Sequence, residues 1–189
     1  MRLAIFAAAA AALAIAPGIA SAQTVEQVGK FTGVELHGGG TITIRQGPAQ
    51  RVTLVRGDPA EARFEVDSRG HLIASPCRGS CWGIRHFDVE IETPDLNEVA
   101  IYGGGHISAK GAFPATGAMS AEIHGGGDID VRDVPAQATS AAIHGGGKIF
   151  VSAQNRLEAA IHGGGAIHYV GHPTVNSEIH GGGSISPIQ

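Results

Sequence analysis

A glycine triplet recurs through this 189-residue chain and restricts its fold more than any other feature of the sequence. Each triplet follows Ile-His or a close variant and precedes a short β-prone run, as in EIHGGGDIDV, AAIHGGGKIFV and AAIHGGGAIHYV. The first glycines of successive triplets are 65, 22, 20, 18 and 18 residues apart. Self-similarity at a period of about 20 residues is typical of stacked repeats. The first glycines are Gly38, Gly103, Gly125, Gly145, Gly163 and Gly181.

The flanks of each triplet alternate between two faces, which predicts strands rather than helices. In AAIHGGGKIFV, Ile143 would face one way and His144 the other, while Ile149 and Val151 share a face. A repeat of this length holds about three short strands, so we expect one turn of a parallel β-helix, stacked at ~4.8 Å on the next. The predicted fold is therefore an all-β, single-stranded parallel β-helix, a right-handed solenoid with coils of 18–22 residues. Glycine corners suit it because they accept positive φ and add no Cβ.

Two rows of isoleucine are expected to fill the interior of the predicted solenoid, because equivalent residues of stacked strands form ladders. One row precedes the glycine triplets and the other follows them. The rows are Ile101, Ile123, Ile143, Ile161 and Ile179, and Ile107, Ile129, Ile149, Ile167 and Ile185.

The N-terminus has the pattern of a secretory signal peptide over residues 1–22. Arg2 precedes an unbroken apolar run, and Ala20-Ser21-Ala22 suits cleavage after Ala22. We expect a single domain over residues 23–189, with a less regular β portion or cap at 28–98 and regular coils at 99–189. No segment of the mature chain is long and apolar enough for a transmembrane helix. The expected location is therefore the periplasm or the cell surface.

Charge and cysteine content narrow the partners of the chain. The net charge is −4, and without a basic stripe we expect no nucleic acid partner. Cys77 and Cys81 in SPCRGSCWG are predicted to form a local disulfide in an oxidising compartment. A metal pair and free thiols remain the alternatives for these two cysteines.

A row of rings precedes the triplets, and we name it the ring row. Strand alternation places these rings on the outer face, and two interpretations remain open. The rings form a stacked polar ladder that protects the glycine corner, or they form a site for divalent zinc, copper or nickel, which neutral imidazoles bind well. No other cofactor is expected. Its members are His37, Tyr102, His124, His144, His162 and His180, of which the last four are the candidate metal ligands.

The tandem xIxGxGxI rungs, the opening FTGVELHGGGTITIRQG and the middle FDVEIETPDLNEVAIYGGGHI resemble the putative autotransporter adhesin head, or GIN, domain family of bacterial envelope proteins. The resemblance covers residues 28–186. It implies a β-helical fold and an exported location, and it implies no catalytic residues. The family typically has Gly-Ser-Gly or Gly-Thr-Gly at the corner, whereas this chain has Gly-Gly-Gly preceded by His.

These observations predict a non-catalytic envelope or cell-surface interaction module of the adhesin-head kind. We expect its partner to be an unidentified protein or glycan, and its coil ends could stack between molecules. A periplasmic metal-binding protein that uses the histidines is the alternative. A carbohydrate-active enzyme is less favoured, because the sequence has no nucleophile–base pair or paired carboxylates at motif spacing.

Overall fold

The computed structural model describes residues 24–79 and 86–188, and the regular elements of this part of the chain are all strands. The strands are β1 (Thr24–Glu26), β2 (Gly33–Gly38), β3 (Thr41–Gln46), β4 (Arg51–Arg56), β5 (Arg63–Val66), β6 (His71–Ser75), β7 (Asp88–Thr93), β8 (Glu98–Gly103), β9 (His106–Lys110), β10 (Thr116–Asp130), β11 (Ala136–Gly163), β12 (Ala166–Val170), β13 (Thr174–Gly181) and β14 (Ser184–Pro187). In these residues no helix is long and apolar enough to cross a membrane.

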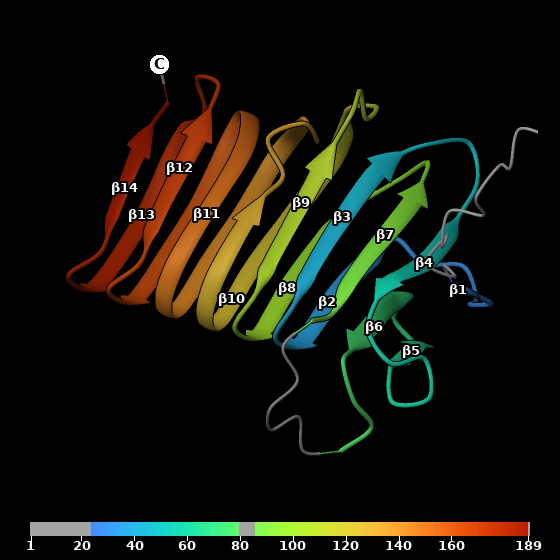
Figure 1. Cartoon of the computed structure of the whole chain (residues 1–189). Coiled ribbons are helices and arrows are strands. Elements are labelled where there is room, and N and C mark those ends of the chain that lie inside the picture. The colour runs from blue at the N-terminus through green and yellow to red at the C-terminus, as the bar shows by residue number, and fades with distance from the viewer. Residues whose placement is uncertain (1–23, 80–85, 189) are drawn as a thin grey trace, which may run out of the picture.

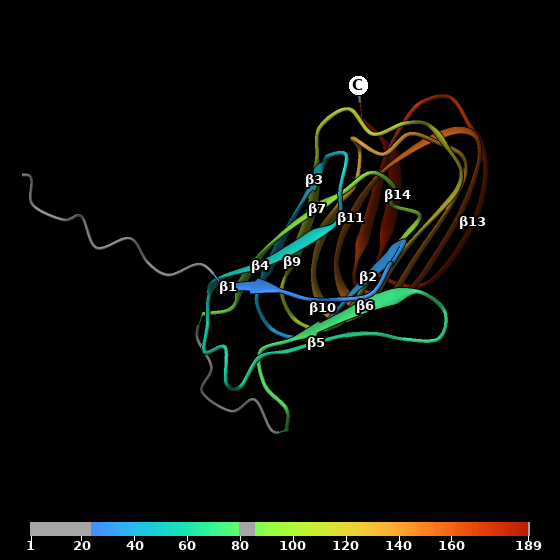
Figure 2. The same cartoon turned by 90° about the vertical axis from the view of Figure 1, so that its right-hand side faces the viewer.

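The strands form one mixed sheet that curls into a nearly closed, barrel-like shape (Figures 1 and 2). Strands β10 and β11 are long enough to bend from one side of the barrel to the other, so the sheet nearly meets itself. The predicted single-stranded parallel β-helix is wrong, because β1 pairs with β4, β4 with β7, and β5 with β6 in antiparallel fashion. Period-two alternation predicts which face a residue takes, but it does not define the direction of the neighbouring strand.

A tight turn explains why β5 and β6 run antiparallel. Residues 67–70 join the two strands, and the Asp67 carboxylate accepts hydrogen bonds from the backbone N–H groups of Arg69 and His71, each at 2.9 Å. Gly70 completes the turn with a φ of +82°. Parallel neighbours would need a long crossover, whereas so short a connection returns the chain as a hairpin.

The glycine repeats nevertheless pair in parallel and in register within this mixed sheet, as predicted for equivalent residues. Ile123 pairs with Ile143 and His124 with His144 between β10 and β11. The first repeat lies directly beside the second, because β2 pairs with β8 and β3 with β9. The interval of 65 residues from Gly38 to Gly103 contains the additional strands β4 to β7: β4 and β7 extend the sheet beyond β3, and β5 and β6 extend it beyond β2. Figure 1 shows β3 lying between β9 and β7.

The isoleucine rows fill the interior, as predicted, except at the C-terminal end. Eight of the ten isoleucines have no exposed surface. Ile179 is instead 43% exposed, and Ile185 is only partly buried. The eight are Ile101, Ile123, Ile143, Ile161, Ile107, Ile129, Ile149 and Ile167.

From the second triplet onward, the first glycine is required by close approach between repeats as well as by backbone conformation. Gly145 has a φ of +131°, and a Cβ built on it would lie 2.2 Å from the carbonyl oxygen of Gly125. Gly146 has open space around its Cβ position. Stacking in register therefore fixes glycine at the first position of the corner, because a side chain there would collide with the preceding repeat.

Two predictions fall on residues whose structure is not described. The signal peptide at residues 1–22 precedes the described part of the chain, and Cys81 lies in the gap between residues 79 and 86. Both the signal peptide and the Cys77–Cys81 disulfide therefore stay predictions.

Candidate functional site

The six rings of the ring row run along the outside of the barrel on five strands, β2, β8, β10, β11 and β13. Neighbouring ring centroids are 4.8–5.1 Å apart from His37 to His180. The rings of His124 and His144 are parallel to within 2°, and those of His144 and His162 to within 0°. In-register parallel pairing produces this stack, because it repeats each side chain at one strand spacing.

The rings point outward, as predicted, but their faces cover one another. Tyr102 is 37% exposed, and the side chain of His180, at the end of the row, is 61% exposed. The exposed part of an inner ring is therefore its edge, which carries the imidazole nitrogen atoms. A ligand on this surface would meet a line of hydrogen-bonding groups at a constant spacing of about one strand.

Carboxylates stand beside three of the histidines, two residues earlier on the same strand. Glu35 Oε2 lies 2.9 Å from His37 Nε2, and Glu122 Oε2 lies 3.4 Å from His124 Nε2. His144 and His162 are preceded instead by alanine. The ring row is thus chemically uneven: a carboxylate stands beside His37, His124 and His180, and an alanine stands beside the other three rings.

A shallow trough runs beside the ring row, where alanines stand two residues before His144 and His162. Two adjoining hollows of about 440 Å³ each share Ser140 and Glu158 in their linings. Ala142 and Ala160 line the hollow nearer the C-terminus, and their short side chains leave it open beside His144 and His162. We call Ser140, Ala142, Glu158 and Ala160 the trough.

A buried polar cluster closes the other end of the ring row, and the sequence analysis did not find it. Glu35 is only 2% exposed, and its carboxylate accepts hydrogen bonds from His37 at 2.9 Å, His71 Nδ1 at 3.0 Å and Arg69 at 2.7 Å. His71 Nε2 lies 3.2 Å from Glu98. In the sequence, the one sign of this cluster is a charged residue, Glu35, in a β-prone run. Arg69 and His71 lie 34 and 36 residues further along the chain, so the sequence does not show that they contact Glu35.

Electrostatics keep Glu35 ionised in spite of its position. Burial raises its pKa, but hydrogen bonds from His37 and His71 and the charge of Arg69 outweigh burial, so the pKa is lowered overall. A carboxyl that acts as a general acid needs the opposite shift. This cluster therefore suits stabilisation of the packing around β2 better than proton transfer.

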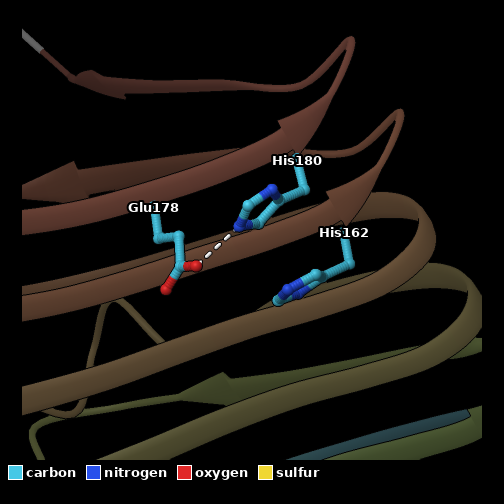
Figure 3. A group of neighbouring side chains, drawn as sticks. All are labelled: His162, Glu178 and His180. Atoms are coloured by element: carbon cyan, nitrogen blue, oxygen red, sulfur yellow. Dashed lines mark hydrogen bonds and ion pairs between the residues drawn. The ribbon is translucent and has the colours of Figure 1, made fainter.

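Three potential metal ligands meet at the C-terminal end of the ring row (Figure 3). His162, Glu178 and His180 each offer a ligand atom, and these atoms lie within 4.8 Å of one another. All three residues are exposed. A hydrogen bond from His180 to Glu178, 2.6 Å long, and the charge of the same histidine lower the pKa of Glu178.

The structure therefore brings together only part of the predicted set of metal ligands. His162 and His180 share a third ligand, whereas His124 and His144 belong to no three-ligand group among the described residues. A second such group, Glu35, Asp67 and His71, lies in the buried cluster. Arg69 binds both of its carboxylates, so a cation already occupies that position.

The described residues thus form a nearly closed all-β barrel whose outer surface carries a regularly repeating ring row. The chain belongs to the family described as "Putative auto-transporter adhesin, head GIN domain", which matches residues 30–116 and 112–173. The predicted family membership is thereby confirmed.

Solved structures with this arrangement include a putative adhesin from Bacteroides fragilis, with 18% identity and a TM-score of 0.54. That match covers 91% of this chain and 99% of the other, and it shows the fold alone. A putative lipid binding protein from Parabacteroides distasonis has 17% identity, a TM-score of 0.42 and coverage of 88% and 96%. A putative adhesin from Parabacteroides merdae has 14% identity, a TM-score of 0.42 and coverage of 89% and 96%. No curated protein matches the sequence.

Proposed function

We propose that the protein is an exported, non-catalytic binding module that works in the bacterial envelope or at the cell surface. Its ligand, a protein or a glycan, would lie against the ring row and the trough. The observation that carries the proposal is the continuous ring row, which repeats every 4.8–5.1 Å on the outside of the barrel. Membership of a family named for adhesin heads supports the same function.

The chemistry of this surface suits an extended ligand that lies along the barrel. Ring edges, the Ser140 hydroxyl and the Glu158 carboxylate offer donors and acceptors side by side, and Ala142 and Ala160 leave room above the sheet. A polymer that makes the same contact at each strand would bind more tightly than a single unit. After the first contact forms, each further contact is intramolecular and does not repeat the loss of translational and rotational entropy. The paired backbones keep the groups at fixed spacing, which lowers the entropy lost on binding.

A direct test is binding of the labelled mature chain, residues 23–189, to an array of purified bacterial and host glycans and to intact bacterial cells. The variant Ala142→Arg would fill the trough without touching the buried isoleucines. Gln154→Arg is the matched control, because Gln154 is exposed on the same strand β11 but does not line the trough.

We expect binding to at least one glycan or cell type, an affinity loss of tenfold or more in Ala142→Arg, and no change in Gln154→Arg. Equal binding by wild type and Ala142→Arg would show that the trough is not the binding surface. Release of shortened oligosaccharides from a bound glycan would contradict the non-catalytic assignment.

A further inference from the structure

The C-terminal end of the ring row differs chemically from the rest of it. His162 on β11 and His180 on β13 pair in register, and their ring centroids are 5.1 Å apart. Glu178 lies two residues before His180 on the same outer face, and its carboxylate reaches the His180 ring (Figure 3). Two imidazoles and one carboxylate thus converge from two strands whose backbones are already paired.

We propose that His162, Glu178 and His180 bind a divalent transition-metal ion of the zinc, copper or nickel class. Imidazole nitrogen and carboxylate oxygen are established ligands of these ions, and three protein ligands with water in the remaining position make a stable open site. This proposal stands independently of the protein or glycan binding proposed above.

The local geometry allows the ligands to close on an ion. Metal–ligand bonds of about 2.0–2.2 Å require the three ligand atoms to be nearer together than the present limit of 4.8 Å. All three residues are exposed, and among the described residues His180 has a ring neighbour on one face only, so modest side-chain rotations of Glu178 and His180 would bring the ligand atoms closer together. The hollow lined by Ala160 and Glu178 leaves space for the water ligands.

The neighbouring histidines make a poorer site because they lack the third ligand. Ala142 stands two residues before His144, at the position where Glu178 precedes His180. His144 is therefore a matched control, since it is a histidine of the same stacked row but has no carboxylate two residues before it.

The test is calorimetric titration of zinc, and separately of nickel, into the chelator-treated mature chain and its Glu178→Gln, His180→Gln and His144→Gln variants. We expect one ion per chain in the wild type. The Kd should rise at least tenfold in Glu178→Gln and His180→Gln and stay within about threefold in His144→Gln. Imidazole NMR signals of His162 and His180 should shift with zinc before those of His124.

Two outcomes would overturn this site. The first is no zinc or nickel binding by a wild-type chain whose circular dichroism shows intact strands. The second is an equal loss of affinity in His144→Gln and His180→Gln, which would mean that the ring row binds ions without regard to the carboxylate.

A separate observation concerns the strand edge at the same end of the barrel. Every residue of β13 is exposed, and among the described strands β13 pairs only with β11. Val175 is 36% exposed and Ile179 43% exposed, although their partners Leu157 and Ile161 are fully buried. An edge of eight residues without lysine, arginine or proline is a template for another strand.

We infer that a second copy of this chain covers this edge, with β13 pairing antiparallel to its own equivalent about a two-fold axis. A register centred on Ser177 places Val175 opposite Ile179 of the second copy, so the exposed apolar residues cover each other. It also places Glu178 opposite Asn176. A shift that centres the pair on Glu178 would oppose two like charges and is disfavoured.

The opposite end of the sheet lacks these features. Its edge strands are short: β1 has three residues, and β5 has four, of which Arg63 and Glu65 are exposed and charged. Short, charged edges resist pairing with another chain. Association through β13 alone is therefore expected to stop at a closed dimer and not continue as a filament.

The test is the molar mass of the chelator-treated mature chain by light scattering over a range of concentrations. We expect a monomer–dimer equilibrium, a monomer for Ile179→Lys, and an unchanged equilibrium for Val170→Lys, whose position is 39% exposed on β12. Ser177→Cys should form a disulfide-linked dimer on oxidation, which wild type does not form.

A wild type that stays monomeric at sub-millimolar concentration would overturn the dimer. Species larger than a dimer would contradict the two-fold arrangement. A dimer that Ile179→Lys leaves unchanged would show that the contact lies elsewhere.

Discussion

Ile161 and Ile179 are direct neighbours on paired strands, yet Ile161 is fully buried and Ile179 is 43% exposed. The difference arises because Ile161 lies between β13 and the preceding repeat of β11, whereas among the described strands β13 pairs only with β11. Replacing Ile161 with alanine should cost about 2–5 kcal/mol of unfolding free energy, the usual range for a buried isoleucine. Ile179→Ala should cost less than about 1 kcal/mol, because much less apolar area is lost.

Urea unfolding of the two variants, at a concentration where the chain is monomeric, checks this prediction. Equal losses of stability would be inconsistent with the exposed end of the barrel.

The two adjacent glycines of one corner should respond oppositely to alanine. Gly145→Ala forces an L-residue to a φ of +131° and brings its Cβ to 2.2 Å from the Gly125 carbonyl oxygen. A loss of about 1–3 kcal/mol is expected from the backbone conformation alone, with the collision in addition. Gly146→Ala meets open space and should be within about 0.5 kcal/mol of wild type.

Thermal and urea unfolding of both glycine variants would measure this difference. If Gly146→Ala were as destabilised as Gly145→Ala, the close stacking of the first glycines would not be the reason for the triplet.

Glu35 and Glu122 occupy equivalent outer positions but should differ in their contribution to stability. Glu35 is buried and accepts hydrogen bonds from three side chains, and removing its charge in Glu35→Gln should cost about 1.5–3 kcal/mol. Glu122 has a side chain that is 37% exposed and one 3.4 Å contact with His124, so Glu122→Gln should cost less than about 1 kcal/mol.

The measurement is urea unfolding of Glu35→Gln and Glu122→Gln at pH 7. Repeating the urea unfolding at lower pH should show that Glu35→Gln loses less unfolding free energy on acidification than the wild type does. The pKa of Glu35 is lowered by folding, so its contribution is present at neutral pH and disappears as the pH falls through that lowered pKa. A Glu35→Gln variant as stable as wild type would rule out the cluster as a structural anchor.

Acid unfolding should depend strongly on Asp130. Hydrogen bonds from Arg132 lower the pKa of Asp130 from 3.8 to about 2, although burial opposes them. The lowered pKa stabilises the folded chain above about pH 4, and this stabilisation is lost as the pH falls toward 2. The contribution is at most about 2 kcal/mol, since one pKa unit corresponds to ~1.4 kcal/mol and solvent around the exposed Arg132 weakens the pair.

Asp130→Asn should therefore flatten the decline in unfolding free energy between pH 4 and pH 2, the two ends of that shift. Asp128→Asn, an exposed neighbour on the same strand, is the control and should keep the wild-type profile. Matching profiles for wild type and Asp130→Asn would refute the assignment of this acid sensitivity.

The repeat pattern was enough to predict local arrangement. The spacing of the triplets and the alternation around them predicted strands, inward isoleucines, outward rings and in-register neighbours. These features depend on the side-chain period of a strand and on the similarity of adjacent repeats, both of which are visible in the sequence. The resemblance to the adhesin-head family came from the same residues and was confirmed.

Only the tertiary structure decided the direction of the early strands, the closure of the sheet and the partners of distant polar residues. The turn at residues 67–70 reverses the chain, so that β5 and β6 run antiparallel, and it brings Arg69 and His71 to Glu35. Nothing in a periodic pattern determines such contacts, because strand direction and closure depend on connections between segments far apart in sequence. Likewise, similar repeats differ in burial at the end of the sheet: Ile179 is exposed there because no further described strand covers it, whereas its partner Ile161 is buried.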